Sequence, residues 1–162
     1  MQDWWATVWE TVEAEFSDLS EADQFARMTV RLLLAVFLGA MLGLERELRG
    51  MAAGLRTHML VALGSALFVV VPLQAGMELD GVGRVLQGVI SGIGFLGAGA
   101  IVKMSGAGEI RGLTTAASIW LTSAIGITAG MGRETTALLT TLLALFILTL
   151  SHLNAKPGDT SD

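Results

Sequence analysis

Long stretches without a charged residue constrain this chain most. They cover residues 57–77, 85–102, 112–132 and 135–155. Each is close to the ~20 apolar residues that a membrane-crossing helix needs. A fifth apolar stretch, residues 28–44, holds one charge near its start, Arg31. A soluble bundle of very apolar helices is the alternative, but so many runs of this length, joined by short loops, favour an all-α polytopic membrane protein with about five transmembrane helices.

The N-terminal segment has a different pattern. Apolar residues recur there at helical spacing, and the acidic residues lie largely elsewhere: Trp5, Val8, Trp9, Val12, Phe16 and Leu19. This predicts an amphipathic helix in the membrane interface with its tryptophans at headgroup level, although a plain tail is the alternative. We therefore expect an interfacial helix over residues 1–24, a transmembrane domain over 25–155 and a short polar tail over 156–162.

The lysines and arginines between the apolar stretches predict the orientation. The loop after the first stretch holds Arg46, Arg49 and Arg56, whereas the acidic N-terminal segment has no Lys or Arg before Arg27. Basic loops face the cytoplasm. We expect the N-terminus outside, the C-terminus in the cytoplasm and, as the location, the bacterial inner membrane.

A glycine motif within the apolar stretch 85–102 requires an explanation. Gly92-x-Gly94-x-x-Gly97 has the spacing of a dinucleotide-binding loop. Such a loop follows a strand and needs an acidic residue about 20 positions later, and this stretch offers neither. Glycines inside a membrane helix instead permit close helix–helix approach, with a kink or break around residues 92–97 as the alternative. The predicted helix-packing residues are Gly39, Gly88, Gly92, Gly94, Gly97 and Gly99, and their glycine-rich faces favour a homo-oligomer, a dimer as the expected form.

The same region reveals an internal repeat. Residues 37–66 align without gaps to residues 95–124, with 11 identities in 30 positions. The two copies share Phe-Leu-Gly-Ala, a Gly-Leu-x-Thr turn and a Leu-x-Ser-Ala segment. Because the offset spans two predicted helices, the copies have the same orientation. We expect a parallel duplicated hairpin, with spans one and two corresponding to spans three and four.

Both repeat loops fall on the predicted cytoplasmic side and bring polar residues together there. We assign a candidate partner site to these residues: Glu45, Arg46, Arg49, Arg56, Thr57, Arg111, Thr114 and Thr115. Anchoring of the arginines to anionic headgroups is the alternative. Within the spans, Gln87 and Ser91 are candidate cavity-lining residues, whereas most other Ser and Thr side chains there are expected to bond to backbone or to a neighbouring helix.

Several classes of function are disfavoured. No Ser/His/Asp arrangement is present, and His58 and His152 lie at span ends without a metal-ligand pattern. We therefore expect no enzyme activity, no cofactor and no resident metal. The net charge of −5 argues against a nucleic-acid partner. The lipid bilayer is the expected environment.

Three long segments resemble the MgtC/SapB family of membrane proteins: LGLERELRGMAAGLRTHMLVALGSALF (42–68), ISGIGFLGAGAI (90–101) and RGLTTAASIWLTSAIGITAG (111–130). The resemblance implies a bacterial inner-membrane protein with about five spans. It places the family's signature residues at Glu45, Arg46, Gly54, Leu55, Arg56, Thr57, Gly92, Gly94, Gly97, Gly99, Gly112, Leu113, Thr114 and Thr115.

The resemblance also implies a role. Family members are linked to growth at low magnesium and to survival inside host macrophages, and some restrain the F-type ATP synthase. This implies a non-catalytic regulator of a membrane partner such as that enzyme. Transport of Mg²⁺ or another ion through a cleft between the repeat copies is the alternative. Many members continue into a cytosolic C-terminal domain, whereas this sequence ends soon after the fifth expected span, so the resemblance does not extend to functions that need that domain.

Overall fold

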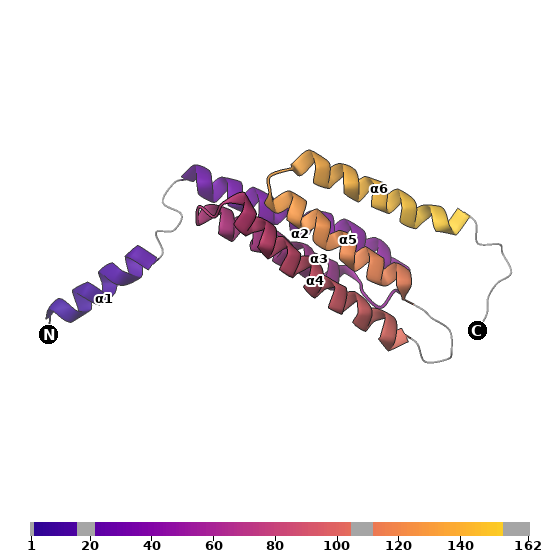
Figure 1. Cartoon of the computed structure of the whole chain (residues 1–162), viewed down its shortest axis with the longest axis horizontal. Helices are drawn as coiled ribbons and strands as arrows, with labels where there is room; N and C mark the ends of the chain where they lie inside the picture. The colour runs from indigo at the N-terminus through magenta and orange to yellow at the C-terminus, as the bar shows by residue number, and fades with distance from the viewer. Residues whose placement is uncertain (1, 16–21, 105–111, 154–162) are drawn as a thin grey trace. The chain divides into compact units, whose positions relative to one another are not determined.

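The computed structural model describes residues 2–15, 22–104 and 112–153. This described part consists of helices joined by turns, without strands (Figure 1). The helices are α1 (Gln2–Glu15), α2 (Ala22–Leu48), α3 (Leu55–Gln74), α4 (Leu79–Met104), α5 (Leu113–Gly130) and α6 (Glu134–Leu153).

Four of these helices are long and apolar enough to cross a membrane: α2, α3, residues 79–101 of α4, and α5. A further helix, α6, is apolar but shorter over the residues searched, Glu134–Leu150. The all-α polytopic architecture predicted from the charge-free stretches is therefore confirmed. Gly92, Gly94 and Gly97 lie within the continuous helix α4, so the alternative of a broken helix is wrong. The turn between α3 and α4 contains Gly76 at φ 73°, a conformation that glycine adopts without strain.

The chain divides into two compact units, residues 1–30 and 31–162. In the first, α1 exposes Trp4, Trp5 and Trp9, and the rings of Trp4 and Trp5 meet edge-on with centroids 4.5 Å apart. The predicted helix is thus present, and its position in a membrane interface stays a prediction. At the start of α2, the Arg27 guanidinium pairs with Asp23 at 2.8 Å.

At the centre of the second unit, α3 and α5 run parallel and in close contact. A Cβ on Gly126 would overlap the Ala62 carbonyl, and one on Gly130 would lie 2.7 Å from the Ala66 carbonyl oxygen. Since 62 pairs with 126 and 66 with 130, both helices advance in the same direction. Small residues permit this backbone approach, as in other membrane helix pairs.

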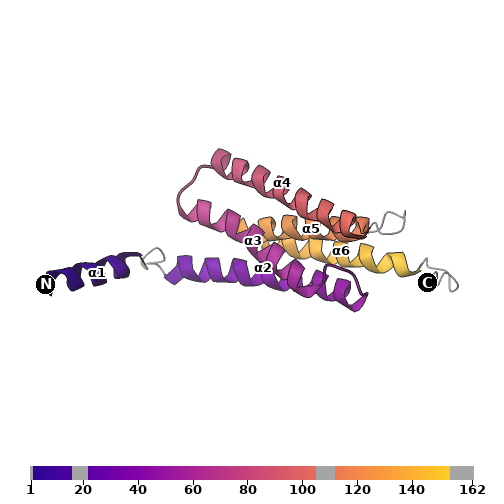
Figure 2. The same ribbon diagram turned by 90° about the horizontal axis from the view of Figure 1, so that it is seen from below.

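The parallel pair carries the internal symmetry of the chain. Ser65 and Ser123, which occupy the same position in the two repeat copies, are hydrogen-bonded to each other at 2.7 Å. An approximate two-fold axis therefore passes between α3 and α5, along the helices. Figure 2 shows α2 on one side of this pair and α4 on the other. The predicted parallel duplicated hairpin is confirmed.

The outer helices pack on this pair differently. A Cβ on Gly39 of α2 would lie 2.7 Å from the His58 carbonyl oxygen of α3, and Gly43 is equally close to Leu55. Between α4 and α5 the approach at Gly97 is looser, because its Cβ would meet Ala116 at 3.6 Å. The helix α2 is therefore tightly docked on α3, whereas α4 leaves space beside that same helix.

Outside the repeat, α6 covers α2 and α5. Ala137, Thr141 and Ala144 are fully or almost fully buried on its inner face, and Ala137 and Ala144 belong to one apolar core with Leu38 of α2 and Ile125 of α5. The Thr141 hydroxyl donates to the Ala137 carbonyl at 2.8 Å, so its polar atom is satisfied within its own helix.

Candidate functional site

The candidate site lies where α2 ends and α3 and α5 begin. After α2, the chain turns at Gly50, which has φ 67°, and the Met51 N–H donates to the Arg46 carbonyl at 3.0 Å. The carboxylate of Glu47 then accepts a hydrogen bond of 2.8 Å from the Leu55 N–H, in the first turn of α3. A carboxylate at this position satisfies an orphan N–H and complements the positive end of the helix. Glu47 thereby fixes the entry of α3 beside α2.

Two guanidinium groups share one carboxylate at the end of α2. Glu45 forms an ion pair with Arg49 one turn later, as the i,i+4 spacing indicates, and Arg46 Nη1 lies 3.4 Å from Glu45 Oε2. Arg46 is only 5% exposed, and its Nε has no hydrogen-bond partner among the described residues. A buried guanidinium with so few partners is costly.

A buried histidine joins α3 to α5. His58 Nδ1 lies 2.9 Å from the Gly54 carbonyl oxygen, and Nε2 lies 3.2 Å from Ser118 Oγ. Because the carbonyl only accepts, Nδ1 carries a proton. Ser118 Oγ is also 2.8 Å from the Thr115 carbonyl oxygen. When the His58 ring is neutral, the Ser118 hydroxyl must donate its proton to Nε2. When the ring is charged, Nε2 donates to Ser118 Oγ, and the Ser118 hydroxyl donates its own proton to the Thr115 carbonyl.

We call Glu45, Arg46, Arg49, His58, Thr115 and Ser118 the polar cluster. It contains four of the predicted partner-site residues. Arg56, Thr57 and Thr114 are exposed on the first turns of α3 and α5, next to the cluster in sequence, and Arg111 lies outside the described residues. The two Gly-Leu-x-Thr turns begin parallel, adjacent helices, so the repeat places both at the same end of the bundle.

Sequence reasoning did not identify His58, Ser118 or Glu47 as site residues. A usable signal was present: His58 and Ser118 are 60 positions apart, close to the repeat offset of 58, and equivalent helices of a parallel repeat lie side by side. For Glu47, the signal was an acidic residue shortly before a helix that begins at glycine without a side-chain cap of its own.

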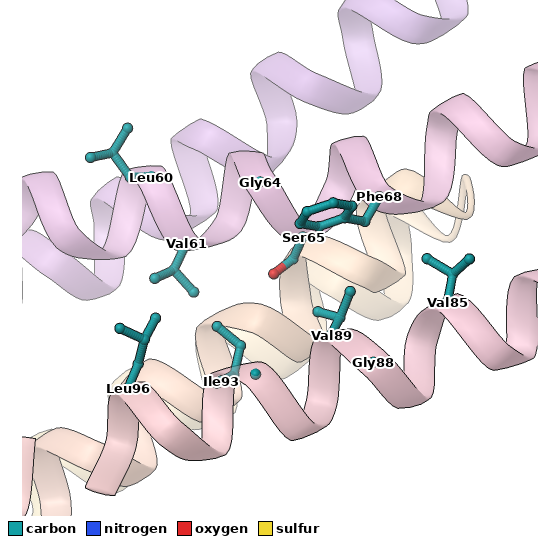
Figure 3. Close-up of a pocket in the computed structure, with 11 residues that line it drawn as sticks. Leu60, Val61, Gly64, Ser65, Phe68, Val85, Gly88, Val89, Ile93 and Leu96 are labelled. Atoms are coloured by element: carbon teal, nitrogen blue, oxygen red, sulfur yellow. The ribbon is translucent and has the colours of Figure 1, made fainter. Parts of the chain in front are cut away.

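An apolar groove of about 600 Å³ lies between α3 and α4 (Figure 3). Leu60, Gly64 and Phe68 form one wall, and Gly88 and Gly92 belong to the other. Ser65 contributes the one side-chain hydroxyl among the residues that line the groove. Gln87 and Ser91, predicted to line a cavity, are exposed on α4 and are absent from the residues that line this groove. They are absent because α4 turns its glycines toward the groove instead.

The six glycines predicted to pack helices occupy different environments. Gly39 is in tight contact with α3, and Gly97 is in ordinary contact with α5. A Cβ added at any of the remaining four would meet nothing within 4 Å: Gly88, Gly92, Gly94 and Gly99. Three glycines that the prediction did not include make contacts as close as that of Gly39 or closer: Gly43, Gly126 and Gly130. Within one chain, the tightest helix contacts therefore lie between α3 and its neighbours α2 and α5, and not on the glycine-rich helix α4.

Several known proteins are similar to this chain. SrpB of Synechococcus elongatus is 47% identical over 132 residues, which cover 75% of this chain and 72% of SrpB. The protein named "Putative magnesium transporter YhiD" of Escherichia coli K12 is 40% identical, with coverages of 78% and 61%. MgtC of Salmonella typhimurium is 43% identical, with coverages of 72% and 48%. The chain thus spans between about half and three quarters of the length of these relatives.

No solved structure shows a significant match to this chain. The profile of the MgtC family matches residues 32–156, which include α3 to α6 and residues 32–48 of α2. The polar cluster, the two Gly-Leu-x-Thr turns and the groove all lie within these residues. The chain belongs to the MgtC family.

Proposed function

We propose that this protein is a non-catalytic regulator in the bacterial inner membrane, which acts on a membrane partner during adaptation to low magnesium or host-cell stress. The name of the relative MgtC and the role implied by the family resemblance support the physiological part. The F-type ATP synthase is the partner that we propose first. The N-terminus lies outside and the C-terminus in the cytoplasm, so the polar cluster faces the cytoplasm.

The apolar character of the α3–α4 groove carries this proposal. A path for Mg²⁺ needs oxygen ligands, usually carboxylates, because the ion gives up its water reluctantly. The groove offers one hydroxyl, and the described residues contain no group of three or more His, Cys, Asp or Glu side chains placed to hold a metal ion. An apolar surface at membrane depth instead fits contact with another helix.

The exposed start of α3 is the proposed partner contact. Arg56 and Thr57 are exposed there, while the buried side chains of His58 and Ser118 link α3 to α5. A partner that engages Arg56 therefore acts on the turn that Glu47 and His58 hold in place. The transmembrane domain over residues 25–155 carries this activity, with residues 1–24 at the membrane interface.

Crosslinking in intact membranes followed by co-purification tests the proposal. We expect magnesium starvation to enrich a membrane partner on the wild-type chain and Arg56→Glu to lose it. Arg133→Glu is the matched control, because Arg133 is exposed at the other end of α5. A starved culture in which no membrane protein is enriched would contradict the proposal.

Ion transport is the second candidate, favoured by the parallel repeat with its internal axis and by the printed name of YhiD. Reconstitution of the folded full chain into liposomes separates the two candidates. A regulator produces no Mg²⁺ or proton flux above that of empty liposomes. Flux that Ser65→Ala and Ser123→Ala alter would favour transport along the axis.

A further inference from the structure

The groove between α3 and α4 has a symmetry-related counterpart between α5 and α2. In the repeat alignment, whose offset is 58 residues, Gly64 is equivalent to Thr122, Ile93 to Ala35 and Leu96 to Leu38. Those three counterparts are fully buried, and Ala35 and Leu38 lie in the core that contains Ala137 and Ala144 of α6. One groove of the pair is therefore covered by α6, and the other has no helix from the described part of this chain upon it.

The uncovered groove has room for large side chains. A Cβ added at Gly64, Gly88 or Gly92 would meet nothing within 4 Å. Figure 3 shows Phe68 and Val85 toward one end of the groove and Leu60 and Leu96 toward the other. An occupant with bulky apolar side chains spaced by one helical turn would place them above these glycines.

The outer face of α6 has that spacing. Leu138, Leu142 and Phe146 are exposed by 43%, 50% and 62%, and they follow Glu134 at intervals of four. On α4, Arg84, Gly88, Gly92 and Leu96 also follow at intervals of four. Both helices run antiparallel to α5, so an α6 from a second copy, in the same membrane, runs parallel to α4.

Charge complementarity fixes the register of such a contact. When Leu138 lies over Gly88 and Leu142 over Gly92, Glu134 lies beside Arg84. Both of these charged residues are exposed, and neither takes part in the ion pairs found among the described residues. At the edge of an apolar groove an Arg–Glu pair contributes more than on an open surface.

We propose that the α3–α4 groove binds the outer face of α6 from a second copy of this chain, with Leu138 and Leu142 seated on Gly88 and Gly92. The groove and α6 lie on opposite sides of the α3–α5 axis, because the groove that α6 covers is related to the open one by a half-turn. The contact is heterologous, since it joins two different surfaces. A pair of copies therefore leaves one groove and one α6 face unoccupied. The copies assemble head to tail in the membrane plane, as a row or a ring, rather than as a two-fold dimer. This inference does not depend on the proposed regulatory role.

Disulfide crosslinking tests the contact directly, because the chain has no cysteine. A disulfide requires Cα atoms within about 7 Å. The full-length double variant Gly92→Cys/Leu142→Cys is oxidised in native membranes, and we expect a ladder of dimers, trimers and larger species. The control is Gly92→Cys/Leu143→Cys, since Leu143 is equally exposed but rotated about 100° around α6. We expect this control to form at least about tenfold less crosslinked product.

The single variants discriminate between occupants. Gly92→Cys alone and Leu142→Cys alone should stay monomeric on oxidation. Dimers from Gly92→Cys alone would indicate a two-fold contact across α4 and overturn the proposal. A double variant that remains monomeric on oxidation would overturn the proposal. The groove would then be occupied by lipid or by another protein, and this conclusion holds whether or not the thiol introduced on α4 reacts with a maleimide.

A charge exchange provides an independent readout. In the Gly92→Cys/Leu142→Cys background, Arg84→Glu places two acidic groups at the contact and should lower the ladder yield about fivefold. Adding Glu134→Arg should restore it. Failure of the exchange to restore the yield, with the chain still extractable as a folded monomer, would contradict the proposed register.

Discussion

The hydroxyl groups of Ser65 and Ser123 form one hydrogen bond of 2.7 Å across the axis that relates the two halves of the chain. Both side chains are buried. The two serines occupy equivalent positions in the two repeat copies, so this bond joins each copy to the other through the same residue type. Such a pair exists only because α3 and α5 are parallel and adjacent.

This pair predicts a measurable coupling. Ser65→Ala leaves the Ser123 hydroxyl buried without its cross-helix partner, so we expect a loss of about 1 kcal/mol of unfolding free energy. Ser123→Ala should cost the same, and the double variant little more than either. Reversible unfolding in mixed micelles, analysed as a double-mutant cycle, provides the measurement. Strictly additive losses would show that the two hydroxyls do not interact.

Close packing at Gly126 predicts a strong dependence on side-chain size. Gly126→Ala places a Cβ on the Ala62 carbonyl, and backbone there has no room to move away. We expect a loss of about 2 kcal/mol or more, as for overpacking in a dense core.

Gly94→Ala is the matched control for this experiment. Gly94 lies within α4, and a Cβ there meets nothing within 4 Å, so the higher helix propensity of alanine should leave stability unchanged or raise it by up to about 1 kcal/mol. Thermal unfolding in detergent distinguishes the two variants. Equal effects at both positions would refute the tight α3–α5 contact.

The histidine bridge predicts that α3 and α5 are linked through His58 and Ser118. His58→Ala removes a buried ring together with both of its hydrogen bonds, and we expect a loss of about 2–4 kcal/mol. Ser118→Ala removes the hydroxyl that lies against both His58 Nε2 and the Thr115 carbonyl oxygen, and it should cost about 1 kcal/mol. In the His58→Ala background, Ser118→Ala should cost less than it does alone, because its partner is already gone. Unfolding titrations of the single and double variants measure this, and an unchanged cost would place the two side chains apart.

The charged residues at the end of α2 predict that losing the shared carboxylate costs more stability than losing the buried guanidinium. Arg46→Met removes a buried guanidinium whose Nε has no partner among the described residues and keeps the volume of the stem, so stability should stay within about 1 kcal/mol of wild type or rise. Glu45→Gln instead leaves Arg46 and Arg49 without their shared carboxylate. We expect a loss of about 2–3 kcal/mol. Denaturant titrations of both variants check this order, and a larger loss in Arg46→Met would contradict the ion-pair assignment.

The sequence by itself determined the membrane class and the symmetry of this protein. Charge-free stretches of the length of a bilayer have few other solutions, because every backbone group must be satisfied within the membrane. The 58-residue offset determined that the repeat copies are parallel, because it spans an even number of helices. Local periodicity and length are sufficient for these conclusions.

Only the tertiary structure decided which residues meet. Glycine density pointed to α4, but the close contacts occur at Gly126 and Gly130 of α5, because proximity depends on which helices are central and not on how many glycines each contains. His58 gained its partner Ser118 in the same way, from a helix 60 positions away. The open groove beside α4 also follows from packing, since the repeat makes two equivalent grooves and the single helix α6 covers one of them.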